Sequence, residues 1–200
     1  MQNTKQKTQN LAFLALLTAL VAVLSYFGGF IKVGGLASIS LTLIPVVLGA
    51  AIQGPLAGAW LGAVSGIVFF FTADAVFWFS LSVPGTVLTV LVKGAMAGYL
   101  AGLSYKLLSK VNRYLAVIVS AIVAPVVNTG IFIGGCFLFF LNTVTAGAAA
   151  EGMSIAAYLI VFFVGLNFVF ELLANIILSP ALYRILNIKS KYSTRTNNIR

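Results

Sequence analysis

Six apolar runs dominate the chain, and short segments rich in glycine, polar or charged residues separate them. The runs cover residues 10–27, 39–53, 56–72, 85–107, 114–141 and 154–186. A helix needs about 20 apolar residues to cross roughly 30 Å of hydrocarbon, and all but the short second run approach this length. The pattern therefore predicts an all-α membrane protein, folded as a compact bundle of six transmembrane helices.

The composition supports a membrane protein, and the distribution of charges predicts its orientation in the membrane. Hydrophobic residues make up 61% of the chain and charged residues 8%, and the mean hydropathy is +1.10. The cations gather before the first run (Lys5, Lys7), between the fourth and fifth (Lys106, Lys110, Arg113) and after the last (Arg184, Lys189, Lys191, Arg195, Arg200). Short basic segments stay on the cytoplasmic side, so both termini are predicted to be cytoplasmic. We expect a cytoplasmic segment at 1–9, a six-span domain at 10–188 and a basic tail at 189–200 that contacts anionic lipid rather than nucleic acid.

Glycines recur every fourth residue in two of the runs. One series is Gly54, Gly58, Gly62 and Gly66, and the other is Gly94, Gly98 and Gly102. Small residues at this spacing form a ridge on one helix face, on which the backbone of a neighbouring helix approaches closely. The two ridges therefore predict tight helix packing.

Two opposite charges, Lys93 and Glu171, lie deep in apolar runs. A charge at mid-bilayer costs roughly 2.5–3.5 kcal/mol, so such residues face a protein interior and mark a pairing or ligand site. Asn167, Glu171 and Asn175 recur every four residues on one helix face. Asn128, near the middle of the fifth run, is another polar candidate. These groups either line a substrate pocket or form a latch between helices, and both hold if a ligand lies beside the charged pair.

Two segments between runs hold further candidates. Residues 30–38 are rich in glycine and contain Lys32, and residues 73–84 contain Asp74 and the aromatic cluster around Trp78. Aromatic residues at this position form either an interfacial belt or a lid over a ligand. We expect both segments to be loops on the outer side, near the polar groups described above.

The residue inventory excludes most catalytic chemistry. The chain has no histidine, a single cysteine at Cys136 and three acidic residues far apart in the sequence. An imidazole base, a carboxylate pair and a Cys/His pair therefore have no residues from which to form. No phosphate-binding loop of the form GxxxxGK[ST] occurs, so the chain alone does not hydrolyse ATP. We expect no catalytic residue, no metal site and no cofactor.

Three motifs and their order resemble a known family. Residues 39–50 (ISLTLIPVVLGA), 53–58 (QGPLAG) and 125–130 (PVVNTG), in a six-span layout over about 11–186, look like the substrate-binding S component of an energy-coupling factor (ECF) transporter. The resemblance implies a bacterial cell-membrane protein that binds a small vitamin near its outer face. It also implies a separate transmembrane T component and two ATPases as partners. The S component would then dock on the T component and tip over in the membrane to release the ligand inward.

The resemblance gives roles to individual residues. Ala15 and Ala19 in the first run would pack against the T component, although ordinary packing within the bundle is the alternative. The residues expected around the ligand are Lys32, Asp74, Trp78, Lys93, Asn128, Asn167, Glu171 and Asn175. Lys93 suits a carboxylate and the asparagines suit hydroxyl or amide groups, as in pantothenate, whereas the aromatic residues equally suit a flat ring.

Two hypotheses from other classes stay open on the sequence alone. The first is a stand-alone carrier coupled to protons, in which Glu171 titrates during transport. The second is a structural membrane protein without a ligand, in which Lys93 and Glu171 form only the latch. Transport by the chain alone would favour the carrier, and intact function after replacing both charges would favour the structural protein.

Overall fold

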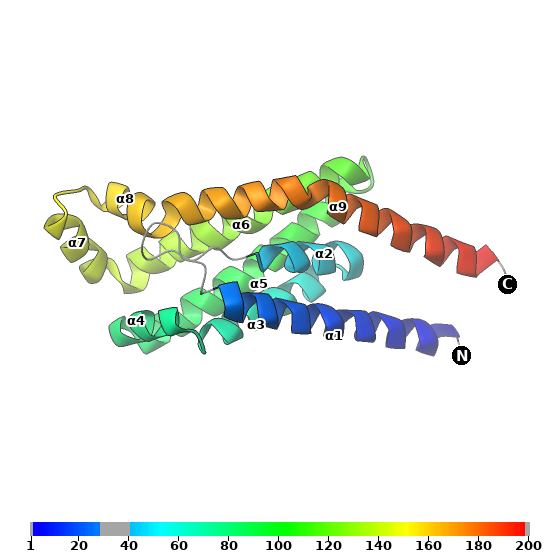
Figure 1. Ribbon diagram of the computed structural model, residues 1–200, viewed down its shortest axis with the longest axis horizontal. Helices are drawn as coiled ribbons and strands as arrows, with labels where there is room; N and C mark the ends of the chain where they lie inside the picture. The colour runs from blue at the N-terminus through cyan, green and yellow to red at the C-terminus, as the bar shows by residue number, and fades with distance from the viewer. Residues whose placement is uncertain (1, 29–40, 199–200) are drawn as a thin grey trace.

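The described part of the chain is helical almost throughout. The computed structural model describes residues 2–28 and 41–198 and has no strand among them (Figure 1). Its helices are α1 (Gln2–Gly28), α2 (Leu43–Gln53), α3 (Pro55–Phe69), α4 (Ala73–Leu81), α5 (Val83–Leu108), α6 (Arg113–Phe139), α7 (Leu141–Ala150), α8 (Ile155–Tyr158), a π-helix (Leu159–Val164) and α9 (Gly165–Asn198). The predicted all-α membrane bundle is confirmed.

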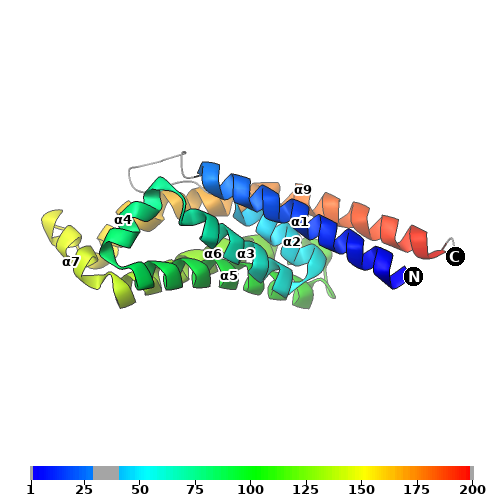
Figure 2. The same ribbon diagram turned by 90° about the horizontal axis from the view of Figure 1, so that it is seen from below.

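Four of the described helices are long and apolar enough to cross a membrane alone. They contain the segments Lys7–Gly28, Val83–Leu108, Arg113–Phe139 and Asn167–Asn187. Two bent pairs raise the number to six if each counts as one span, namely α3 with α4, bent by 85°, and α7 with the segment Ile155–Phe162, bent by 95°. The short second run forms α2, whose 11 residues rise only about 16 Å. α1 begins and α9 ends at the same end of the bundle (Figures 1 and 2), as an even number of crossings requires.

A tight turn joins α2 to α3, as the sequence predicts. Gly54 has a φ of 98°, which glycine adopts without steric cost, and Pro55 occupies the first turn of α3, where its missing N–H costs nothing. Pro45 is buried in the first turn of α2 and therefore does not interrupt that helix. The turn folds α2 back beside α3, and both helices contact α5.

The two glycine ridges pack against each other. A Cβ added at Gly62 would overlap the carbonyl of Gly94, and one added at Gly58 would overlap that of Gly98. One turn along, a Cβ at Gly66 would lie 3.0 Å from the carbonyl oxygen of Val90. Side chains are thus absent between α3 and α5, so their backbones touch directly. This contact sets the position of α5, on which Lys93 lies.

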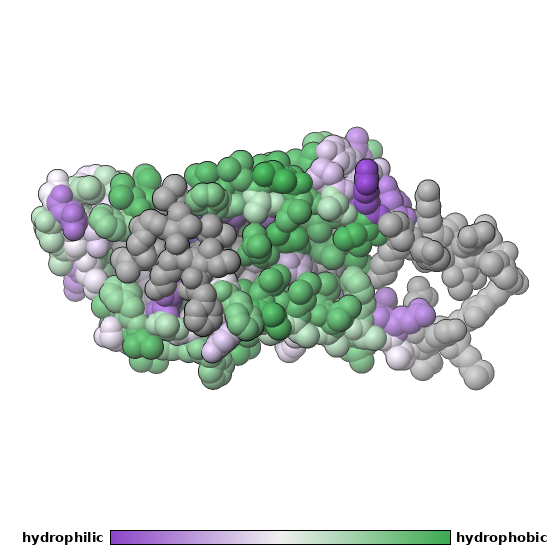
Figure 3. Space-filling model, viewed as in Figure 1, coloured by the Kyte–Doolittle hydropathy of each residue, from purple (hydrophilic) through white to green (hydrophobic). Residues whose placement is uncertain are grey.

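Apolar side chains fill the remaining contacts and cover the outside. Leu17 and Val21 of α1 are buried against Val46 of α2 and Leu61 of α3. On the face that Figure 3 shows, the coloured middle is predominantly hydrophobic and most hydrophilic residues lie toward the ends. This distribution suits a body surrounded by lipid, in which lipid tails solvate the exposed apolar side chains.

Two of the segments that separate the apolar runs are helical. Residues 73–84 contain α4, and residues 141–150 form α7. The sixth predicted span, 154–186, begins as α8 and the π-helix before α9. Residues 73–84 were expected to be a loop because they interrupt the apolar runs, but in an apolar setting a helix is the simplest way for a segment to satisfy its backbone hydrogen bonds.

Candidate functional site

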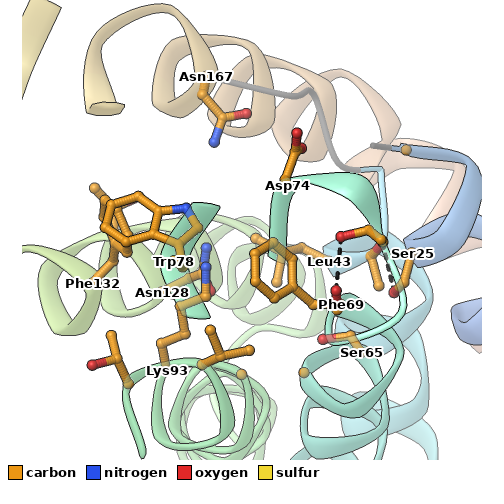
Figure 4. A pocket seen from close by; sticks show the side chains of 18 of the residues that line it. Ser25, Leu43, Ser65, Phe69, Asp74, Trp78, Lys93, Asn128, Phe132 and Asn167 are labelled. Atoms are coloured by element: carbon orange, nitrogen blue, oxygen red, sulfur yellow. Dashed lines mark hydrogen bonds between the residues drawn. The ribbon is translucent and has the colours of Figure 1, made fainter. Parts of the chain in front are cut away.

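A cavity of about 170 Å³ lies in the half of the bundle remote from the termini. One water needs about 10–15 Å³ on the same measure, so the cavity has room for a small molecule. Its wall draws on α1, α2, α3, α4, α5, α6 and α9, and side chains from several of these helices point toward one space (Figure 4). Polar lining residues are Ser25, Thr42, Ser65, Thr72, Asp74, Thr86, Thr89, Lys93, Asn128, Thr129, Asn167 and Glu171.

α5 supplies a positively charged side chain to the cavity. Thr86, Thr89 and Lys93 follow one another at helical spacing and therefore share the face that lines the cavity. The Lys93 ammonium lies 5.1 Å from the ring centroid of Phe132 and 5.8 Å from that of Phe69. Both distances suit cation–π attraction, which holds the ammonium between α3 and α6 without neutralising its charge.

α4 turns Trp78 toward the bundle. The Trp78 ring meets those of Phe132 and Phe140 edge to face, with centroid distances of 5.3 and 5.2 Å. Thr86 Oγ1 donates a hydrogen bond of 2.8 Å to the Trp78 carbonyl oxygen, which ties α4 to α5. The neighbouring Phe77 is exposed. The aromatic segment therefore divides, with Trp78 forming part of the cavity wall and Phe77 facing outward.

α6 contributes its residues just beyond a proline. Pro125 is buried inside the helix, and it cannot donate a hydrogen bond to the carbonyl of Ala121. Asn128 and Thr129 follow one turn later and line the cavity, as does Phe132. The structure thus places Asn128 beside a cavity, as the proline argument predicts.

α9 carries a polar face from the cavity into the bundle. Asn167 and Glu171 line the cavity, whereas Asn175 is buried below it and donates a 2.7 Å hydrogen bond from Nδ2 to the Glu171 carbonyl oxygen. Ser179 Oγ repeats the pattern with the Asn175 carbonyl oxygen at 2.9 Å. Among the described residues, Asn167 Oδ1 and Thr89 Oγ1 are buried without a hydrogen-bond partner. Buried polar atoms of this kind are unusual and mark sites for water or ligand.

The cavity brings together six of the eight residues expected around a ligand. These six are Asp74, Trp78, Lys93, Asn128, Asn167 and Glu171. Asn175 lies behind the wall, and Lys32 lies outside the described residues. Glu171 is near enough to act on Lys93 through its charge, but the described contacts of the Lys93 ammonium are the two phenyl rings rather than an ion pair with Glu171. The arrangement thus has the form of a pocket, and ligand binding by these residues stays a prediction.

Sequence reasoning missed part of the lining. Thr86 and Thr89 share a face with Lys93, and this spacing was a usable signal. Phe69 and Phe132 follow Ser65 and Asn128 by four residues on the same helix faces, but a phenyl group in an apolar run carries no signal of its own. Hydroxyl and phenyl groups are common throughout transmembrane helices, so only the packing shows which of them face a cavity.

Ala15 and Ala19 lie outside this cavity, on α1. Both are exposed, while Leu17 and Val21 of the same helix are buried. Packing within the bundle would need Ala15 and Ala19 to be covered, so the structure leaves this strip of α1 open.

No group of three or more His, Cys, Asp or Glu residues that could hold a metal ion occurs in the described part of the chain.

Comparison with known protein families gives a match over most of the chain. Residues 9–184 match the family model described as ECF transporter, substrate-specific component. No curated protein matches the chain. The matched region covers α1 through most of α9 and includes every described residue of the cavity. The chain therefore belongs to the family of substrate-specific components of ECF transporters.

Proposed function

We propose that this chain captures a small micronutrient of vitamin size at the outer face of a bacterial cell membrane and delivers it inward. The observation that carries the proposal is the polar cavity at the end of the bundle remote from both termini. With the termini cytoplasmic, as the basic segments predict, this end faces outward. Binding there would place the ligand among Trp78, Lys93, Asn128 and Asn167.

The energy for delivery would come from partner proteins. The chain has no phosphate-binding loop, and membership of the ECF family supports a T component and two ATPases as the partners that drive uptake against a gradient. The exposed Ala15 and Ala19 leave a strip of α1 on which a helix of the T component would pack closely. Leucine at either position would keep that helix away while leaving the cavity untouched.

Radiolabelled uptake in cells tests the proposal. Cells that produce the chain together with a T component and two ATPases should accumulate at least one of pantothenate, biotin, pyridoxal and thiamin, and cells that lack the ATPases should not. Ala15→Leu and Ala19→Leu should lower uptake several-fold while the purified variants keep the ligand affinity of the wild type. The control is Ala181→Leu, which makes the same substitution at an exposed position on α9, away from this strip. Uptake that persists without ATPases and follows a proton gradient would contradict the proposal and favour a stand-alone carrier.

A further inference from the structure

One wide turn interrupts the helix that continues as α9. Among the described residues, π geometry occurs only at Leu159–Val164, directly before α9. The Gly165 N–H donates a hydrogen bond to the carbonyl oxygen of Ile160, five residues back, where an α-helix would use the residue four back. A Cβ at Gly165 would lie 2.5 Å from that oxygen, so glycine suits this hydrogen bond. A turn of this kind holds one residue more than an α-helical turn, and such turns are frequent at functional sites.

The extra residue keeps two buried positions on one face. Leu159 and Glu171 are both buried, and 12 positions separate them along the chain. In a regular α-helix, this separation would place the two side chains about 120° apart around the helix axis. Because the wide turn absorbs one residue, the separation equals about 11 α-helical steps, and the side chains lie about 20° apart. The π-helix therefore has the form of a one-residue insertion into a continuous helix.

Two short helices are attached to this turn. α7 and α8 together span residues 141–158, here called the α7–α8 hairpin, and the π-helix joins them to α9. A Cβ added at Gly147 would overlap the Tyr158 ring, so α7 and α8 pack tightly on each other. Of the ten residues of α7, only Val144 and Ala148 are buried. A unit with so few buried contacts opens at a lower free energy than the helices of the bundle.

The α7–α8 hairpin covers the single cysteine of the chain and adjoins the cavity. One buried apolar cluster joins the hairpin to α6, and it consists of Cys136, Phe140, Val144 and Leu159. Trp78 and Phe132 pack against this cluster, and both also line the cavity, as does Phe140. Movement of the hairpin away from the cluster would therefore expose Cys136 and open the cavity wall beside Trp78.

A hinge needs a place where a helix bends at low cost. Helices bend sharply at π turns, and the chain bends by 95° between α7 and the segment Ile155–Phe162, which includes part of the π-helix. We propose that the π-helix is the hinge on which the α7–α8 hairpin opens and, resting on the proposed function, that this opening admits the ligand. The hairpin lies at the end of the bundle remote from the termini, where the ligand would enter (Figure 1).

A one-residue deletion removes the hinge and keeps the fold. Val161 is exposed in the π-helix, and the chain without it should form a continuous α-helix that keeps Leu159 and Glu171 on one face. This variant should unfold at or above the temperature of the wild type. The matched control lacks Leu173, which is exposed in a regular turn of α9. That deletion rotates the buried Glu171 by about 100° relative to Asn175, so the control should unfold at a lower temperature.

The reaction of Cys136 with N-ethylmaleimide measures the opening on the full-length purified protein. Cys136 is the one cysteine in the chain and is buried, so the reagent reports on this position alone. The reaction should be several-fold slower without Val161 than in the wild type. Val144→Ala weakens the packing of the hairpin and should speed the reaction, whereas Thr145→Ala, at an exposed position of the same helix, should leave the rate unchanged.

Two results would overturn the hinge. Equal losses of stability on deletion of Val161 and of Leu173 would show that the π-helix is required by the fold and is not an insertion. A folded chain that lacks Val161, and whose Cys136 reacts as fast as in the wild type, would show that the hairpin does not open on this turn. Both measurements need no ligand, so they are independent of the proposed function.

The uptake assay described above tests whether the hinge serves transport. Deletion of Val161 should lower uptake several-fold, because the closed hairpin keeps the ligand from the cavity. Unchanged uptake together with a slower reaction of Cys136 would overturn the role of the hinge in admitting the ligand. Failure of the wild type to take up any of the four vitamins would contradict the proposed function and leave the hinge itself standing.

Discussion

Gly62→Ala is the sharpest test of the packing between α3 and α5. The added Cβ would lie 2.5 Å from the carbonyl carbon of Gly94 and closer still to its oxygen, whereas ordinary contacts begin at 3.4 Å. Both partners are backbone, so no side chain can rotate away, and the helices must separate by roughly 1 Å. We therefore expect a loss of stability even though alanine is the better helix former.

The size of the effect follows from two opposing terms. Overpacking a tight contact costs about 1–3 kcal/mol, and replacing glycine by alanine within a helix returns about 0.5–1 kcal/mol. The net cost of about 1–2 kcal/mol corresponds to an unfolding temperature lower by about 2–8 °C for a chain of this size. Gly130→Ala on α6 is the matched control, because no atom lies within 4 Å of its added Cβ, so only the stabilising term acts.

Thermal unfolding of the purified variants in one detergent measures the difference. Gly62→Ala should unfold below the wild type, Gly130→Ala at or above it, and Gly66→Ala between these two, since its Cβ meets the Val90 carbonyl oxygen at 3.0 Å. The separation of α3 from α5 should also weaken ligand binding, because it moves Phe69 away from Lys93. Equal unfolding temperatures for Gly62→Ala and Gly130→Ala would refute the direct backbone contact.

Two further measurements address the hydrogen bonds and the cavity wall. Ser120 donates a buried 2.9 Å hydrogen bond to the Ala101 carbonyl oxygen, so Ser120→Ala should lower the free energy of unfolding by about 1 kcal/mol. The control Ser109→Ala, just after the end of α5, should change thermal unfolding little, because its hydrogen bond is exposed. A larger loss for Ser109→Ala than for Ser120→Ala would contradict the packing of α5 on α6. The chain has two tryptophans, and Trp78 lines the cavity while Trp60 is exposed. Ligand binding should therefore change the fluorescence of the Trp60→Phe variant, in which only Trp78 remains, and leave the fluorescence of the Trp78→Phe variant unchanged. A fluorescence change seen only in Trp78→Phe would place the ligand near Trp60 and away from the cavity.

The apolar runs predict the long helices well because lipid imposes a simple rule on them. Residues 85–107 and 114–141, read from hydropathy alone, correspond to α5 and α6 within a few residues. The rule misses α4 and α7, which are helices in segments that separate the apolar runs. Hydropathy reports burial in an apolar medium, and it does not report the bends of 85° and 95° that set these short helices apart.

The candidate site shows the same division. Lys93, Asn167 and Glu171 were identified because a charge or an amide in an apolar run carries a cost that packing must offset. Phe69 and Phe132 carry no such cost, so their place beside the Lys93 ammonium emerges only from the structure. The glycine ridges lie between these cases, since their spacing predicted close approach and the fold shows that the partner of each ridge is the other.

The hydrogen bonds of α9 have a consequence for how helices slide past one another. Asn175 and Ser179 are buried, yet their side chains donate to carbonyl oxygens of α9 itself. Ser120, in contrast, fastens α6 to α5. A shift of α6 along α5 must break that hydrogen bond, whereas α9 carries the bonds of Asn175 and Ser179 with it as it moves. What holds α9 in register is therefore side-chain packing, with Leu182 in the apolar core and Tyr183 against Tyr114, and not the hydrogen bonds of its own polar residues.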